Sequence, residues 1–192
     1  MFNIVLLEPE IPANTGNIGR TCLVTGSRLH LIEPMGFILN DKNLKRAGMD
    51  YWYDLDVTVY DSFRDFVFKN LNNISFAPDI LQKFGYENEI DPDTGTKKAD
   101  IWMATTKALY THDKAHYKDG DYIMFGKESA GIPEDILLTS AETCIRIPMA
   151  ESQRSLNLSN SVAVVLYEAL RQNDYPGLKL KGRLHHNSWP LI

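Results

Sequence analysis

The sequence of 192 residues has only two cysteines, no long apolar run and no excess of basic residues. No stretch approaches the roughly 20 apolar residues that span a membrane. The start, MFNIVLLEPE, has no basic region and reaches Glu8 too early for a signal peptide. Cys22 and Cys144 form no CxxC pair, so we expect no metal site and two buried, reduced thiols. These absences predict a cytoplasmic protein without a membrane segment.

The charge balance excludes another class of protein. The chain has 20 Lys and Arg against 25 Asp and Glu, a net charge of -5, which argues against a polybasic nucleic-acid binder. The net charge does not say where the charges lie. Hydrophobic residues make up 44% of the chain and charged residues 23%, as in a globular domain rather than a disordered chain. The length fits one domain.

Short apolar runs alternate with helix-like segments along the chain. The runs predict strands at residues 2–8, 28–34, 57–60, 101–105, 122–125 and 144–147. Capping residues predict helices from Asn14 or Thr15 to Gly26, over 41–47, from Ser62, over 133–138, and from Ser159 or Asn160 onward. This alternation predicts an α/β fold with a mainly parallel sheet flanked by helices.

Two segments differ from the rest in charge. Residues 79–100 carry six acids against three lysines, with Pro92 and Gly95, which predicts an acidic, turn-rich insertion within about 74–100. From Tyr175 onward the chain has three basic residues, two histidines and no acid. We therefore expect a single domain at 1–172 and a basic C-terminal tail at 173–192.

Several familiar motifs are excluded. Gly120 and Gly126 have the wrong spacing for a P-loop, and Glu128 stands where that loop has Ser or Thr. The sequence has no GxGxxG after a strand and no GxSxG. Residues 16–19 have the form of a KH-type GxxG loop, but the α/β alternation around them does not fit that domain.

Three segments where a strand gives way to a loop or helix are stronger candidates. The first is NTGNIGR, from Asn14 to Arg20. A helix that begins near Thr15 would hold Arg20 about one turn in, close to the loop. A capped helix with a solvated arginine would explain the same spacing.

The second segment is FGKESAGIP, residues 125–133. A strand end, two glycines and a proline at the start of a helix make a tight loop whose backbone can approach a ligand closely. Glu128 then lies at the carboxyl ends of the strands, where open α/β sheets bind ligands. An ordinary turn between a strand and a helix is the alternative.

The third segment, residues 145–161, contains IRIPM and then RSLNLSNS. One or two Ser or Asn side chains would satisfy the N–H groups in the first turn of a helix. The further Ser and Asn residues of this segment, beyond those that a cap requires, predict polar contacts to a ligand.

Together, NTGNIGR, GKESAGIP and RIPM…RSLNLSNSVAV resemble motifs 1, 2 and 3 of the SPOUT class of RNA methyltransferases. The opening IVLLEPEIPANTGNIGRTC, with LHLIEP and FG-x-E-x-x-GIP, is most similar to one branch of that class. This branch comprises the small, single-domain tRNA (cytidine/uridine-34)-2′-O-methyltransferases, often called YibK-like. The resemblance covers roughly residues 2–60 and 101–172.

The resemblance implies a fold whose C-terminal part forms a deep trefoil knot, a rare exception to unknotted chains. It also implies that S-adenosylmethionine binds between the loops at 126–131 and 145–157, with Leu156 against the adenine. By position, the implied cofactor-binding residues are Ala104, Thr105, Gly126, Glu128, Gly131, Ile147, Pro148, Ser155 and Leu156.

Members of this branch are homodimers in which each active site is completed across the interface, and the resemblance implies the same here. The final helix would contribute to the interface, although core packing explains its apolar positions equally well. Those positions are Val162, Val165, Leu166 and Leu170.

The implied reaction is 2′-O-methylation of the wobble nucleotide, position 34, in the tRNA anticodon stem-loop. Arg20, Asn14, Ser155 and Asn157 match the family's catalytic group. A ribose hydroxyl is a poor nucleophile, so its deprotonation must be assisted. Because a guanidinium is a poor base, we expect Arg20 to stabilise the developing alkoxide. Glu128 either orients Arg20 or supports its own loop.

An acidic protein can still bind RNA if one face carries the basic residues. The candidates for that face are Arg20, Lys42, Lys45, Arg46, Arg154 and the basic tail. Two alternative functions are a 2′-O-methyltransferase that acts on ribosomal RNA and a non-catalytic, cofactor-binding RNA-binding or assembly factor. The small size without an appended RNA-binding domain favours the anticodon-loop enzyme.

Overall fold

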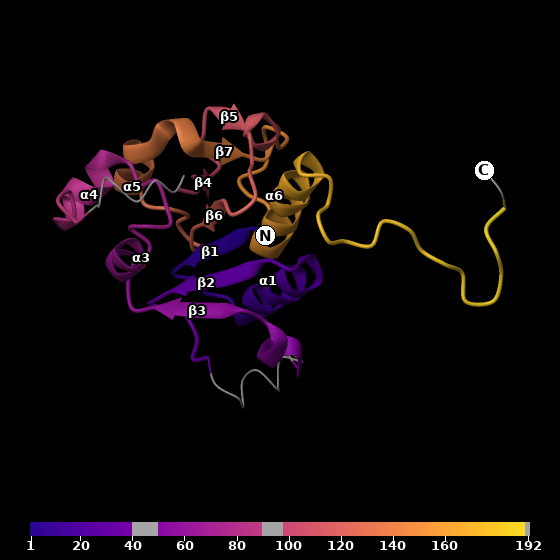
Figure 1. The fold of residues 1–192 in the computed structure, drawn as a ribbon. Coiled ribbons are helices and arrows are strands. Elements are labelled where there is room, and N and C mark those ends of the chain that lie inside the picture. Colours follow the sequence, from indigo (N-terminus) through magenta and orange to yellow (C-terminus); the bar gives the residue numbers. More distant parts are fainter. Residues whose placement is uncertain (40–49, 90–97, 191–192) are drawn as a thin grey trace.

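The computed structural model describes residues 1–39, 50–89 and 98–190. In this part of the chain seven strands form one sheet in the order β3-β2-β1-β6-β4-β7-β5, and all neighbouring strands run parallel (Figure 1). The predicted α/β fold with a mainly parallel sheet is therefore confirmed. The strands are β1 (Asn3–Leu7), β2 (Arg28–Ile32), β3 (Val57–Tyr60), β4 (Ile101–Ala104), β5 (Tyr110–Thr111), β6 (Tyr122–Phe125) and β7 (Cys144–Arg146).

Helices cover both faces of the sheet (Figure 1). Two of them, α1 (Pro12–Thr25) and α6 (Leu158–Gln172), pack on one face, and α3 (Phe63–Lys69), α4 (Pro78–Phe84) and α5 (Glu134–Leu137) pack on the other. No helix in the described ranges is long and apolar enough to cross a membrane. Short 3₁₀ helices occupy Asp50–Asp54 (η1), His112–Lys114 (η2) and Leu138–Thr143 (η3).

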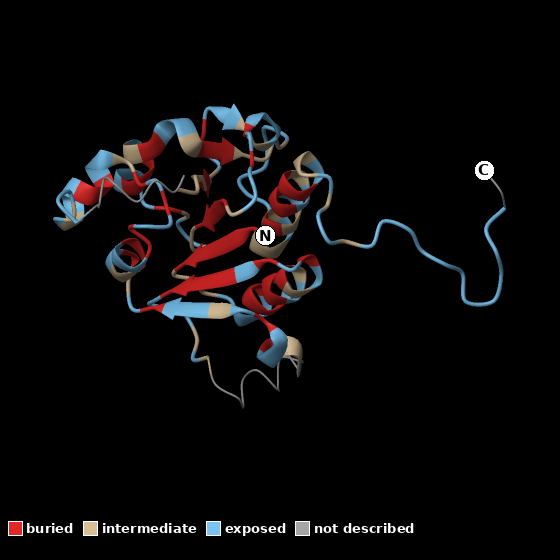
Figure 2. Ribbon diagram, in the orientation of Figure 1, coloured by how far each residue is buried: buried red, intermediate tan, exposed pale blue. Residues whose placement is uncertain are grey.

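The central strands are buried on both faces, which explains why they are continuous apolar runs rather than alternating ones. In β1, Ile4 and Leu6 belong to the core beneath α1 and α6, whereas Val5 and Leu7 belong to the core beneath α3, α4 and α5. Figure 2 shows β1 and most of β2 as buried. The sheet thus separates two hydrophobic layers.

Helix α1 begins earlier than the sequence predicted. It starts at Pro12 with Ile11 in the N-cap position, so Asn14 and Thr15 lie inside the helix, and their prediction as caps was wrong. Proline suits the first turn because its φ is already helical and no N–H partner is required there. The predicted end is confirmed, since Gly26 follows the helix in the left-handed conformation, with φ 67°.

The predicted N-cap is correct for α3 and wrong for α6. Ser62 caps α3 as expected, because its hydroxyl accepts a hydrogen bond from the N–H of Asp65. In α6 the cap is Asn157 rather than the predicted Ser159 or Asn160. The Asn157 side-chain oxygen accepts hydrogen bonds from both of their N–H groups, at 2.9 and 3.3 Å.

The acidic segment at 79–100 contains more regular structure than its composition predicted. Helix α4 occupies its beginning and buries Ile80 and Leu81, which are 1% and 5% exposed. The prediction of turns is therefore wrong for this part, where a proline begins the helix and a glycine ends it. The predicted helix at 41–47, with Lys42, Lys45 and Arg46, lies outside the described residues. Residues 90–97 of the acidic segment lie outside them as well.

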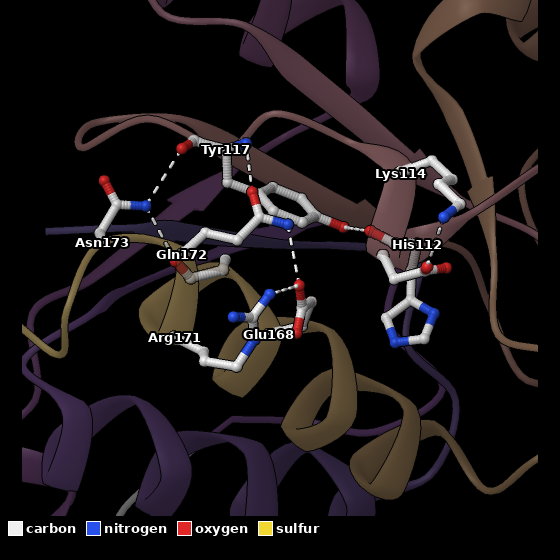
Figure 3. Close-up of polar contacts among 9 residues, drawn as sticks. His112, Lys114, Tyr117, Glu168, Arg171, Gln172 and Asn173 are labelled. Carbon is white, nitrogen blue, oxygen red and sulfur yellow. Dashed lines mark hydrogen bonds and ion pairs between the residues drawn. The ribbon is translucent and has the colours of Figure 1, made fainter.

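The C-terminal end of α6 is fixed to the segment between β5 and β6 (Figure 3). Gln172 Oε1 accepts a hydrogen bond from the backbone N–H of Tyr117 at 3.2 Å, and Asn173 Nδ2 donates to the Tyr117 carbonyl at 3.0 Å. Hydrogen bonds from Arg171 and Gln172 lower the pKa of Glu168 to about 2. These contacts orient α6, whose other end carries the Asn157 cap.

Cys22 and Cys144 are both free and buried, which confirms the prediction for the two thiols. Burial raises the pKa of Cys22 to about 12, so its thiol stays protonated.

Candidate active site

Loops that follow β1, β6 and β7 meet at the carboxyl ends of the central strands. Strands β1 and β6 are neighbours in the sheet, but β1 leads to α1 on one face and β6 leads to α5 on the other. In open α/β sheets, ligands bind at the crevice where successive connections leave in opposite directions. The topology therefore makes the space between these loops the candidate ligand site.

A cleft of about 550 Å³ occupies this position, within the size range of small-molecule sites. Its inner wall includes the buried Phe125, Ile145 and Val165. Most of the residues predicted from the sequence line it, and Arg20 and Pro148 do not. The predicted residues that line the cleft are Asn14, Ala104, Thr105, Gly126, Glu128, Gly131, Ile147, Ser155, Leu156 and Asn157.

The carboxylate of Glu128 joins the loop after β6 to the start of α1. Its Oε2 accepts a hydrogen bond from the N–H of Glu10 at 2.8 Å, and Oε1 accepts from the N–H of Ile11 at 3.3 Å and from Asn14 Nδ2 at 2.9 Å. Ile11 has no capping side chain of its own, so Glu128 supplies the acceptor and the negative charge that this helix end favours. Within one chain, Glu128 therefore supports the loop, and Arg20 of the same chain is not among its hydrogen-bond partners.

Asn14 links Glu128 to the third loop. Its Oδ1 accepts a hydrogen bond from Asn157 Nδ2 at 3.0 Å, while its own Nδ2 donates to Glu128. Asn157 Oδ1 in turn caps α6. The three motifs identified in the sequence are thus joined by one hydrogen-bonded path.

Two acidic residues that the sequence analysis did not select brace the same loops. Glu8 Oε2 lies 2.7 Å from the ammonium of Lys127, and Glu10 accepts hydrogen bonds from the N–H and the hydroxyl of Ser129, both at 2.8 Å. The bonds from Ser129 lower the pKa of Glu10. The signal for this role was the EPE run directly after the first strand.

Gly126 lies where the second loop folds back most closely on itself. A Cβ at this position would lie 2.0 Å from the carbonyl carbon of Gly131 and 2.2 Å from the nitrogen of Ile132. Gly131 has φ 71°, and its N–H donates to the Lys127 carbonyl at 2.8 Å. Both glycines are therefore required by the backbone of this loop.

Arg20 lies outside the cleft of its own chain. Because α1 begins at Pro12, Arg20 is about two turns into the helix, and the expectation of one turn, close to the loop, was wrong. Its exposed guanidinium stacks 4.1 Å from the ring centroid of Tyr51, an arrangement favoured by the ring quadrupole. The Tyr51 hydroxyl donates to the Gly16 carbonyl, and burial raises the pKa of Tyr51, so this hydroxyl stays a donor.

A parallel sheet with a cleft between these loops is the architecture of a known class of methylases. The chain matches the SpoU rRNA Methylase family over residues 1–78 and 81–167, and it belongs to that family. The relationship expected from the three sequence motifs is therefore confirmed.

More specific similarities come from relatives that match almost end to end. The tRNA (cytidine(34)-2'-O)-methyltransferase of Escherichia coli (strain K12) is 46% identical over 182 residues, which cover 94% of this chain and 99% of that relative. A crystal structure of a putative RNA methyltransferase from Bacillus anthracis is 40% identical, with a TM-score of 0.77 over 94% of this chain and 99% of that one. A structure described as giving structural insights into the 2-OH methylation of C/U34 on tRNA is 34% identical, with a TM-score of 0.71 over 91% and 97% of the two chains.

Proposed function

We propose that this chain transfers a methyl group from S-adenosylmethionine to the 2′-hydroxyl of nucleotide 34 in the anticodon loop of tRNA. The observation that carries the proposal is the 46% identity to a tRNA (cytidine(34)-2'-O)-methyltransferase over 94% of this chain and 99% of that relative. The convergence of the three motif loops on one cleft supports it. We propose that the enzyme acts in the cytoplasm, where its tRNA substrate is found.

The cleft fits S-adenosylmethionine in size and chemistry. Its volume of about 550 Å³ and its apolar wall suit a cofactor with a purine ring, and the glycines of the second loop allow the backbone to approach closely. When bound, the cofactor supplies an electrophilic methyl group. We propose that it is held by Ala104, Thr105, Gly126, Gly131, Ile147, Pro148, Ser155 and Leu156, with Glu128 acting through the loop that it supports.

The same proposal includes a deep trefoil knot in the C-terminal part of the domain. The strand order supports it, because β6 inserts between β1 and β4, and β7 inserts between β4 and β5. Helix α6 then returns to pack against α1. The domain spans residues 1–172, and residues 173–192 form a basic tail.

The first catalytic task is to hold the 2′-hydroxyl in line with the methyl carbon and the sulfur. Ser155 and Asn157 line the cleft with a hydroxyl and a carboxamide, and we assign them to the ribose. Each carboxamide nitrogen of Asn14 and Asn157 carries two N–H groups, and one of each is used in the path to Glu128. The second N–H of each is available to orient the substrate.

The second task is to stabilise the negative charge that develops on the 2′-oxygen, which we assign to Arg20. Since Arg20 lies outside its own cleft, this role requires that a second copy of the chain brings it to the active site. Val24, one turn further along α1, faces the same side as Arg20 and is 57% exposed. Val164 and Tyr167 on the adjacent α6 are 40% and 45% exposed.

These exposed apolar residues support a homodimer formed through α1 and α6. The residues considered for this interface from the sequence instead pack into the core of their own chain, because they lie on the inward face of α6. They are Val162, Val165, Leu166 and Leu170, all at most 2% exposed.

The experiment that tests this function is methyl transfer from labelled S-adenosylmethionine to bulk tRNA and to ribosomal RNA, followed by mapping of the modified nucleotide. The account predicts label in tRNA as 2′-O-methylated nucleotide 34. Label in ribosomal RNA alone would favour the substrate in the family's description. Cofactor binding with no transfer to either RNA would favour a non-catalytic RNA-binding or assembly factor.

A further inference from the structure

The charges that line the cleft are not equally compensated. Two of the lining cations are paired: Lys107 Nζ lies 2.8 Å from Glu134 Oε1, and Lys127 Nζ lies 2.7 Å from Glu8 Oε2. The third lining cation, Arg154, has no ion pair or hydrogen bond within the described ranges of the chain. Among the described residues that line the cleft, Arg154 is thus the cation without a partner for its charge.

The anionic side of the cleft does not compensate Arg154 either. Glu128 is the acidic residue among the described lining residues, and both of its oxygens accept hydrogen bonds at the start of α1. Arg154 lies instead in the irregular loop before α6 and is exposed. An uncompensated guanidinium at the mouth of a cleft favours an oxyanion from outside the protein, because its planar fork binds two anionic oxygens at once.

We infer that Arg154 binds a phosphodiester of the RNA next to the target nucleotide, an assignment that rests on the proposed function. The exposure of Arg154 places it where an RNA strand arrives from solvent, whereas the apolar wall of the cleft is formed by buried side chains such as Phe125 and Val165. A phosphate contact fixes the position of the strand without reading its bases. Arg154 therefore positions the ribose relative to the cofactor.

A second oxyanion would enter the same cleft when S-adenosylmethionine binds, namely the carboxylate of its methionine portion. Both groups suit a guanidinium, so the test measures RNA binding and cofactor binding separately. The variants are Arg154→Gln, which removes the charge, and Arg154→Lys, which keeps the charge and loses the planar fork. The matched control is Arg64→Gln, because Arg64 is an exposed arginine on α3, on the opposite face of the sheet from α1 and α6.

The RNA measurement uses a synthetic anticodon stem-loop and fluorescence anisotropy at several salt concentrations. We expect Arg154→Gln to weaken RNA binding about tenfold at low salt, as for the loss of a hydrogen bond to a charged group. The slope of log Kd against log salt should fall by about 0.7, the value for one phosphate of a single strand. Arg154→Lys should keep the slope, and Arg64→Gln should leave both quantities unchanged.

A neutral methylphosphonate at each phosphate flanking nucleotide 34 identifies the contact. At one of these positions the replacement should weaken binding to the natural chain and have no further effect on Arg154→Gln. Titration with S-adenosylhomocysteine should give the same affinity for the natural chain and Arg154→Gln.

Weaker binding of S-adenosylhomocysteine with an unchanged RNA slope would overturn the inference and assign Arg154 to the cofactor carboxylate. Unchanged binding of both ligands would also overturn it. These experiments measure binding, so their outcome can be told apart from a failure of the proposed methyl transfer. If only the proposed function failed, the natural chain would bind the stem-loop through Arg154 and still not methylate nucleotide 34.

Discussion

Asn14 Nδ2 donates a hydrogen bond to Glu128 Oε1 at 2.9 Å and thereby fixes the first turn of α1 to the loop after β6. The same Asn14 side chain accepts a hydrogen bond from Asn157, so a single carboxamide connects three loops that are far apart in the sequence. The ligand cleft is bounded by these loops. A substitution at Glu128, Asn14 or Asn157 should therefore also displace the loops that the substituted residue does not contact directly.

Replacement of Glu128 with glutamine tests the support of the loops. Glutamine keeps the size but has one acceptor oxygen and no charge, and its NH2 group would face N–H donors at the start of α1. We expect the free energy of unfolding to fall by about 1–3 kcal/mol, with weaker binding of S-adenosylmethionine. Urea denaturation and calorimetric titration measure the two effects. Asp56→Asn, which breaks an exposed pair with Arg28, should cost about 1 kcal/mol or less. Equal effects in the two variants would contradict a supporting role for Glu128.

Two substitutions of Asn157 separate the cap made by its side-chain oxygen from the tasks of its carboxamide nitrogen. Asn157→Asp keeps an acceptor at the N-terminus of α6, where a negative charge is favourable. It loses both carboxamide N–H groups, the one donated to Asn14 and the one assigned to the ribose. We expect near-natural thermal stability and a large loss in kcat. Asn157→Ala loses both functions and should also lower stability by about 1 kcal/mol. Full activity of Asn157→Asp would show that the link to Asn14 is not needed for turnover.

His30 should make stability depend on pH. Burial lowers its pKa to about 4, and its ring lies between the Tyr60 hydroxyl at 2.9 Å and Asn3 Oδ1 at 3.2 Å. The unfolded chain takes up a proton on His30 below about pH 6.5, whereas the folded chain does so only near pH 4. The neutral His30 therefore contributes its full stabilisation above about pH 6.5. The free energy of unfolding falls by about 3 kcal/mol as the pH drops to 4.

Urea denaturation between pH 7.5 and 4 measures this effect. His30→Asn should remove this part of the pH dependence, while His116→Gln, at an exposed histidine, should retain it. The same pH dependence in His30→Asn and the natural chain would rule out His30 as its source.

Mixing two inactive variants tests whether the active site is shared between subunits. Arg20→Ala removes the proposed stabilising charge and keeps the cleft, whereas Gly126→Ala forces the second loop apart and keeps Arg20. In a mixed dimer, one cleft is intact and receives an intact Arg20 from the other subunit. We expect co-purified mixed dimers to regain activity that neither variant has alone, as measured by methyl transfer to tRNA. Inactive mixed dimers would contradict the shared site.

The central strands β1 and β6 could be predicted from the sequence because buried parallel strands are continuous apolar runs. At the edges of the sheet, β3 was predicted although Tyr60 is its one buried residue. β5 was not predicted, because it has only two residues and no recognisable pattern. The acidic composition of residues 79–100 concealed α4, whose two buried residues decide its structure more than its exposed charges do.

The members of the candidate site could be predicted largely from local motifs, but the way in which they are joined could not. Asn14 or Thr15 was expected to cap α1, yet the N-cap residue is Ile11, and its N–H donates to Glu128 in a loop more than one hundred residues away in the sequence. Such a contact depends on β1 and β6 being neighbours in the sheet. Likewise, no local pattern placed Arg20 on Tyr51, outside the cleft.

The most direct measurement of the central claim uses tRNA that differs from the natural substrate in one atom. A tRNA with a 2′-deoxyribose at nucleotide 34 has lost only the proposed nucleophile, so the account predicts that it binds as the unmodified tRNA does but accepts no methyl group. Methyl transfer to the deoxy substrate at the rate of the unmodified tRNA would contradict 2′-O-methylation of nucleotide 34.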